Sequence, residues 1–178
     1  MKSVVFKKQA ALFCVIFVCG VLAPRLFYLF GAGDYCAALS PMHIFALTCG
    51  FVCGRRYGGV CGFLMPVAAG ALFGAPAVYP TAIAMGFEML AYGYLTGLLR
   101  SKIHFAAALA AAMAGGRLLY LAVRLLLGAM YGGAYSLTEW FGEIFLTGWP
   151  SIVCSFVVVG TLIFTLKKAG IVRFDEND

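Results

Sequence analysis

Charged side chains are scarce in this sequence. Asp, Glu, Lys and Arg make up 11% of the 178 residues, while 63% are hydrophobic; soluble domains are about one-quarter charged. A soluble chain of this length must cover its apolar core with polar residues, and too few are present here. The composition excludes an ordinary soluble domain and predicts that lipid covers most of the surface.

Catalytic motifs are also lacking. The sequence contains no His-Glu-x-x-His, no Gly-x-Ser-x-Gly with a matching His and no phosphate-binding loop. Of the two histidines, His104 follows the basic Lys102, which places it at the opposite membrane face from His43. We therefore expect no catalytic residue, no cofactor and no use of ATP by the chain itself.

The cysteines form no disulfide pattern. They number seven, and all but Cys36 lie within apolar stretches, which disfavours a disulfide framework. Cys49 and Cys53 would share one helix face, a spacing that a soft metal could use, but close packing of small residues explains it more simply. No metal site is predicted.

Basic residues outnumber acidic ones by 13 to 7. They gather in short clusters, unlike the continuous stripe of a phosphate-binding surface, so no nucleic-acid partner is expected. The clusters occupy every second junction between apolar stretches: Lys2/Lys7/Lys8, Arg55/Arg56, Arg100/Lys102 and Lys167/Lys168/Arg173. The positive-inside rule then predicts a multi-pass protein of the cell membrane with both termini cytoplasmic.

Six apolar stretches follow one another at residues 8–30, 43–55, 58–74, 79–99, 103–128 and 144–166. The first is long enough to cross about 30 Å of hydrocarbon, and no clear cleavage site follows it, which indicates a membrane helix rather than a signal peptide. The second and third are short, and residues 55–59 between them are expected to form a tight turn. These features predict one all-α domain, residues 1–178, with six transmembrane helices.

Two further patterns concern packing and the outward face. Gly50, Gly54, Gly58 and Gly62 repeat every four residues, which predicts closely packed helices. The longer junctions, residues 31–42 and 128–142, face outward in the predicted topology. They either form a site or merely connect helices.

Two charged side chains lie deep within predicted helices. Glu88 stands twelve residues before Arg100, and Arg117 stands fifteen residues after Lys102, which puts them about 18 Å and about 22 Å along their helices. Charge in hydrocarbon is costly and normally has a task. Either the two pair with each other as a structural lock, or Arg117 presents its guanidinium to an anionic ligand from outside. One pair can serve both purposes.

Polar and aromatic groups gather at the predicted outer helix ends. His43 opens the second helix, where it either contacts a ligand or caps the helix. Tyr79 opens the fourth helix and Trp149 opens the fully apolar part of the sixth, as residues of an aromatic belt or of a pocket mouth. Arg25 and Arg124 are expected to extend to the headgroups. The residues expected to bind substrate are His43, Tyr79, Glu88, Tyr92, Arg117 and Trp149.

Several ordered strings resemble one family. Residues 39–44 (Leu-Ser-Pro-Met-His-Ile), 49–54 (Cys-Gly-Phe-Val-Cys-Gly) and 57–58 (Tyr-Gly) resemble the second helix of S components, the substrate-binding subunits of energy-coupling factor (ECF) transporters. Residues 72–76, residues 79–85 and Glu88 are similar to the third loop and fourth helix of that family. Residues 112–117 and 147–150 are similar to its fifth and sixth helices, so the resemblance spans nearly the whole chain.

The resemblance implies a six-helix membrane subunit with a vitamin pocket that opens outward. It also implies partners, namely a transmembrane coupling protein and two cytoplasmic ATPases, with which the S component topples and releases its vitamin inside. In that family small residues spaced by four on the first helix contact the coupling protein; Ala10 and Cys14 fit this pattern loosely, and Val18 departs from it. The most similar branch contains pantothenate and folate transporters, whose anionic substrates suit Arg117, and pantothenate is the expected vitamin.

Two other classes of function fit the sequence less well. A small integral membrane enzyme or assembly factor would use Glu88, Arg117 and His43 on a lipid-linked substrate, but no nucleophile stands with a base. A channel would need a helix lined with polar residues, and the sequence has none. Transport of a vitamin is the function that the sequence favours.

Overall fold

All regular structure in the described part of the chain is helical. A computed structural model describes residues 2–131 and 135–170. Five helical segments are long and apolar enough to cross a membrane: α1 (Lys2–Leu29), α4 (Arg55–Phe73), α5 (Ile83–Leu99) with the short π-helical turn η1 (Val78–Ala82) before it, α6 (Phe105–Tyr131) and α8 (Trp149–Lys168). The predicted all-α fold is confirmed, and its length and composition fit a multi-pass membrane protein.

The sixth apolar helix, α3 (Pro41–Cys53), is shorter than the others. Its 13 residues extend about 20 Å at 1.5 Å per residue. The helix begins directly after Ser40, whose left-handed backbone (φ 44°) separates it from α2 (Gly33–Leu39), and it ends at Gly54 (φ 89°). Helix α3 is thus shorter than the hydrocarbon layer, so helix length supports five membrane crossings.

The reversal between α3 and α4 differs from the expected one. The turn predicted at residues 55–59 is wrong, because the chain reverses at Gly54 alone and α4 begins at Arg55. Glycine adopts the positive φ of Gly54 without steric cost. Gly58 and Gly59 therefore lie inside α4, where they are available for packing.

Glycine packing joins α3, α4 and α5. A Cβ atom on Gly58 would collide with the carbonyl oxygen of Gly93 and with the backbone of Gly50, and one on Gly62 would collide with the carbonyl of Met89. Backbones approach this closely only where side chains are missing. The predicted close packing of Gly50, Gly58 and Gly62 is confirmed, whereas Gly54 serves the reversal.

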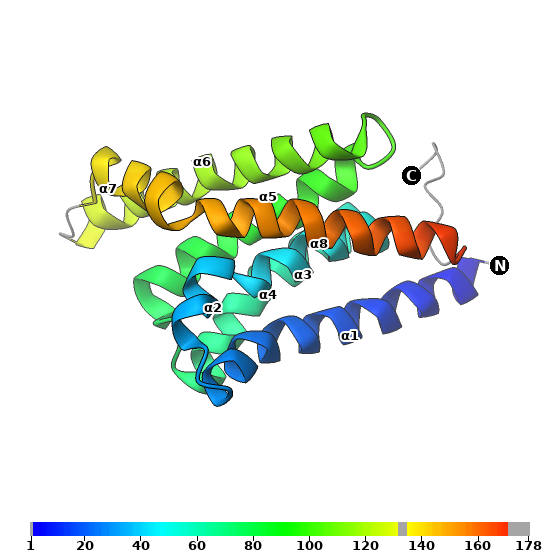
Figure 1. Cartoon of the computed structure of the whole chain (residues 1–178), viewed down its shortest axis with the longest axis horizontal. Coiled ribbons are helices and arrows are strands. Elements are labelled where there is room, and N and C mark those ends of the chain that lie inside the picture. Colours follow the sequence, from blue (N-terminus) through cyan, green and yellow to red (C-terminus); the bar gives the residue numbers. More distant parts are fainter. Residues whose placement is uncertain (1, 132–134, 171–178) are drawn as a thin grey trace.

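The two long junctions that were expected to face outward contain helices of their own. The segment 31–42 holds α2, and after α6 the chain forms α7 (Leu137–Gly142) and a π-helical turn, η2 (Glu143–Thr147). Ser136 starts α7 with a capping box, in which it and Glu139 each accept the other's backbone N–H. Figure 1 shows α2 and α7 at one end of the bundle and the start of α1 with the end of α8 at the other.

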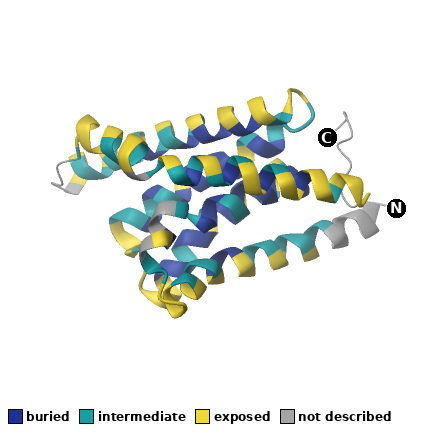
Figure 2. Cartoon of the chain, viewed as in Figure 1, coloured by how far each residue is buried: buried dark blue, intermediate teal, exposed yellow. Residues whose placement is uncertain are grey.

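Burial is greatest in the middle of the bundle. In Figure 2 the buried residues concentrate on α3, α4 and α5, while α1 and α8 carry exposed residues along their outer sides. Large apolar side chains are exposed there, among them Val18, Val157 and Phe164. An outer surface of this kind is suited to lipid rather than to water.

Candidate functional site

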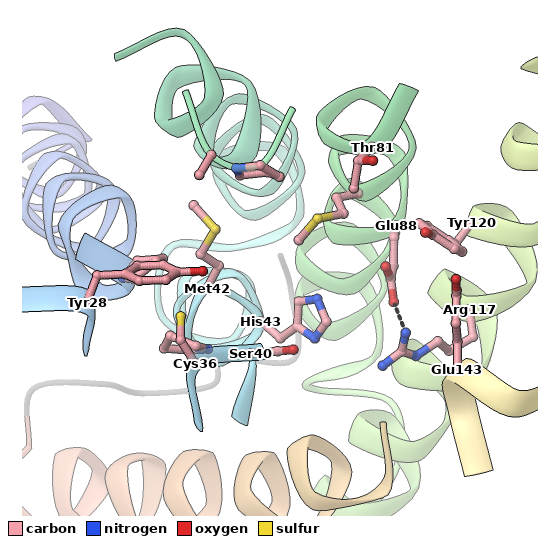
Figure 3. Close-up of a pocket in the computed structure, with 15 residues that line it drawn as sticks. Tyr28, Cys36, Ser40, Met42, His43, Thr81, Glu88, Arg117, Tyr120 and Glu143 are labelled. Atoms are coloured by element: carbon pink, nitrogen blue, oxygen red, sulfur yellow. Dashed lines mark ion pairs between the residues drawn. The ribbon is translucent and has the colours of Figure 1, made fainter. Parts of the chain in front are cut away.

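A cavity of about 420 Å³ lies at the end of the bundle that carries α2 and α7. Its walls come from the end of α1, from α2, the start of α3, the loop before α5, α5 itself, the middle of α6 and the start of η2 (Figure 3). Most of the wall is apolar, and a few polar groups converge on the space, as in small-molecule sites. The polar side chains at the cavity are those of Tyr28, Cys36, Ser40, His43, Thr81, Glu88, Arg117, Tyr120 and Glu143.

An ion pair across α5 and α6 forms part of the wall. The Nη1 atom of Arg117 lies 3.2 Å from Oε1 of Glu88, and the Tyr92 hydroxyl donates to the same oxygen at 2.6 Å. Gly116 permits this contact, because a Cβ at that position would collide with the Tyr92 ring. The small residue beside the arginine thus lets α6 approach α5 closely enough for the pair to form.

His43 is buried beside this pair without a hydrogen-bond partner. Its ring is 3% exposed and lies edge-on to Tyr92, with 5.2 Å between the ring centroids. Within the described residues neither ring nitrogen has a partner, although buried polar groups are nearly always hydrogen-bonded. Figure 3 shows the imidazole directed into the space between Met42 and Glu88. His43 lines the cavity, and the hydrogen-bonding capacity of its ring nitrogens is unused.

Arg117 has donors to spare. Glu88 occupies Nη1, while Nε is buried and has no partner in the described chain. A guanidinium offers five N–H donors in a planar fork, so donors remain for a second acceptor. Arg117 and Glu88, the charged residues that the sequence singled out, line the same cavity as His43.

The sequence did not identify Glu143 and Tyr120 as parts of this wall. Glu143 accepts a hydrogen bond from the Tyr135 hydroxyl at 2.7 Å, and the Tyr120 ring stands edge-on to Tyr135. Burial, and then the bond to Glu143, raise the pKa of Tyr135, so this phenol stays protonated and able to donate at neutral pH. The only sequence signal for Glu143 as a site residue was its position directly before the last apolar stretch.

Arg124 makes a contact that the sequence did not predict. Its guanidinium carbon lies 4.6 Å from the centre of the Tyr135 ring, a cation–π contact, and its extension to the headgroups stays a prediction. Trp140 in α7 donates from Nε1 to the Arg117 carbonyl oxygen at 3.2 Å. Through these two contacts Tyr135 and α7 pack against α6, next to the cavity.

The other predicted residues lie elsewhere. Tyr92 is fully buried and reaches the site only through its hydrogen bond to Glu88. Tyr79 and Trp149 are 46% and 57% exposed and do not line the cavity. Ala10 is half-buried and Cys14 exposed on α1. Contact of Tyr79 and Trp149 with substrate, and of Ala10 and Cys14 with a partner, stay predictions. The side chains of Lys2, Lys7 and Lys8, and residue Arg173, lie outside the described residues.

The arrangement is suited to binding. Cys36 is the strongest nucleophile type at the cavity, but burial raises the pKa of its thiol and keeps it in the less reactive protonated form. Among the side chains that the structure describes, no three of His, Cys, Asp or Glu gather as they would around a metal ion. The polar groups present can orient a small molecule by hydrogen bonds and charge.

Comparison with known proteins adds no relative. No protein-family model, no curated protein and no solved structure matches this chain.

Proposed function

We propose that this chain is the substrate-binding S component of an ECF-type importer and that its cavity binds a water-soluble vitamin. The observation that carries the proposal is the cavity beside Arg117 and His43, two buried groups that keep unused hydrogen-bonding capacity. An unsatisfied buried polar group costs about 1–3 kcal/mol. A ligand that satisfies both groups recovers this free energy on binding.

Pantothenate is the vitamin we propose first. Its carboxylate suits the remaining donors of Arg117, and its amide and hydroxyl groups can exchange hydrogen bonds with His43, since a neutral imidazole both donates and accepts. The carboxylate of Glu143 at the same cavity can accept from a ligand hydroxyl. The volume of about 420 Å³ lies within the range of small-molecule pockets.

We further propose six crossings with both termini in the cytoplasm. The short helix α3 is buried along nearly its whole length, so the helices around it, not α3 itself, meet the hydrocarbon. Beyond the ends of such a short span, non-helical backbone is tolerated at membrane depth where it is buried in protein. The basic clusters then lie on the cytoplasmic side, and the cavity opens outward.

The proposal includes the partners of an ECF importer. The chain would work with a transmembrane coupling protein and two cytoplasmic ATPases, and Ala10 and Cys14 on α1 would contribute to the contact with the coupling protein. The first helix packs only against one side of the bundle and leaves its outer side exposed. Such a surface is available to another membrane helix.

Uptake tests the function. A bacterial pantothenate auxotroph that lacks its own transporter should accumulate labelled pantothenate when it expresses this chain together with an ECF coupling protein and its ATPases. The coupling module without the chain is the control. If the assembled complex imports none of a panel of pantothenate, folate, riboflavin and thiamine, the proposal is wrong.

A further inference from the structure

A second hollow lies on the lipid-facing side of the contact between α4 and α5, toward the opposite end of the bundle from the cavity. It has a volume of about 300 Å³. Gly59 of α4 faces the Cβ of Tyr94 on α5. Because glycine has no side chain, space remains between the two helices at this point. The large side chains of Val60, Leu64 and Tyr94, each 40% exposed or more, flank this space. The result is an apolar groove that follows the first half of α4.

Two arginines stand at one end of the groove. Arg55 and Arg56 begin α4, line the hollow and are exposed. In the part of the chain that the structure describes, neither forms an ion pair. Their charges are therefore available to an anion whose apolar part lies between α4 and α5.

We infer that this groove binds one anionic phospholipid, with its phosphate at Arg55 and Arg56 and an acyl chain along the helices. Guanidinium groups bind phosphate oxygens through paired hydrogen bonds. From Arg55 to Leu64 the helix rises about 14 Å, which accommodates much of one acyl chain. A groove without the arginines would accept a chain from any lipid, so the arginines supply the preference for an anionic headgroup.

The size of the groove favours a lipid over a protein partner. Stable protein interfaces bury about 800 Å² on each side, whereas this hollow is lined by only a short stretch of two helices. Its position between transmembrane segments keeps it in contact with the bilayer. The inference does not depend on what the outer cavity binds.

Lipid retention tests the inference directly. The chain is reconstituted in vesicles of equal phosphatidylglycerol and phosphatidylcholine, extracted in mild detergent and weighed with its bound lipids by native mass spectrometry. Wild type should retain phosphatidylglycerol in preference. Because a cation near an anionic membrane surface contributes about 1 kcal/mol, R55Q/R56Q should reduce the ratio of the two retained lipids by about fivefold for each arginine.

Two further variants control for charge and for the groove. K167Q/K168Q removes two exposed cations from the end of α8 and should leave the ratio near that of wild type. V60W fills the groove without changing charge and should lower retention of lipid of either kind. Equal retention of the two lipids by wild type, or an effect of K167Q/K168Q as large as that of R55Q/R56Q, would overturn the inference. The inference would also be overturned if V60W retained as much lipid as wild type.

Discussion

Arg117 and Glu88 form an ion pair in which the two partners are unequally accessible. The atoms Nη1 and Oε1 are 3.2 Å apart, and the side chain of Arg117 is 16% exposed while that of Glu88 is 2% exposed. The carboxylate is thus held in the protein by Arg117 and by the Tyr92 hydroxyl, and the arginine is the member that a ligand can reach. The pair can act as a lock and as part of a binding site at once.

Stability measurements should separate these two roles. Replacing Arg117 by Ala leaves the Glu88 carboxylate buried without its cation, and we expect the free energy of unfolding to fall by about 3–5 kcal/mol. The double variant Glu88→Leu/Arg117→Met removes both charges and should recover most of that loss. Chemical or thermal unfolding in detergent measures both. Failure of the double variant to recover stability would contradict the lock.

Replacement of His43 should lower ligand affinity without lowering stability. Because neither ring nitrogen has a partner in the described structure, replacing His43 by Phe removes an unsatisfied polar group and should leave the unfolding temperature of the ligand-free protein unchanged or higher. Ligand affinity should fall by about 1–3 kcal/mol. His104→Phe, at an exposed position away from the cavity, is the matched control for ligand affinity; it should leave affinity unchanged while losing the bond that His104 Nδ1 accepts from the Ala106 N–H. A large loss of stability in ligand-free His43→Phe would show that the imidazole is structural.

Tyr92 is expected to stabilise Glu88 through its hydroxyl. Tyr92→Phe keeps the ring against His43 but removes the 2.6 Å hydrogen bond to the carboxylate. A hydrogen bond to a charged group contributes about 1.5–3 kcal/mol, and the unfolding free energy should fall by that amount. Tyr94→Phe, two residues along the same helix and exposed, should have no comparable effect; equal losses in the two variants would rule out this role.

The glycine contact between α4 and α5 predicts a steric effect. A methyl group at Gly58 would meet the backbone of Gly93, so Gly58→Ala should destabilise the fold by about 1–3 kcal/mol. Gly160→Ala is the control, since its Cβ would lie 3.6 Å from the Phe105 ring, an ordinary contact. Thermal unfolding should show a lower midpoint for the first variant only, and an unchanged midpoint there would show that the helices can separate slightly.

The sequence predicted the features that hydrophobicity and buried charge determine. Long apolar stretches became helices, and the cost of charge in hydrocarbon pointed to Glu88 and Arg117. The reversal at Gly54 was missed because the sequence does not show which of several nearby glycines adopts a positive φ and which ones pack. Glu143 was missed because a carboxylate in a polar segment has the composition of an ordinary loop, and only the folded chain brings it to the cavity.

The central proposal is that a vitamin binds in the cavity at Arg117, and calorimetric titration tests it most directly. Pantothenate, folate, riboflavin and thiamine are titrated into the purified wild type, Arg117→Ala and Arg25→Ala, the last at an exposed arginine on α1. We predict one tight ligand for wild type and Arg25→Ala, with pantothenate first, and an affinity lower by about 2–5 kcal/mol for Arg117→Ala. No binding across the panel, or equal affinity in all three proteins, would contradict the proposal.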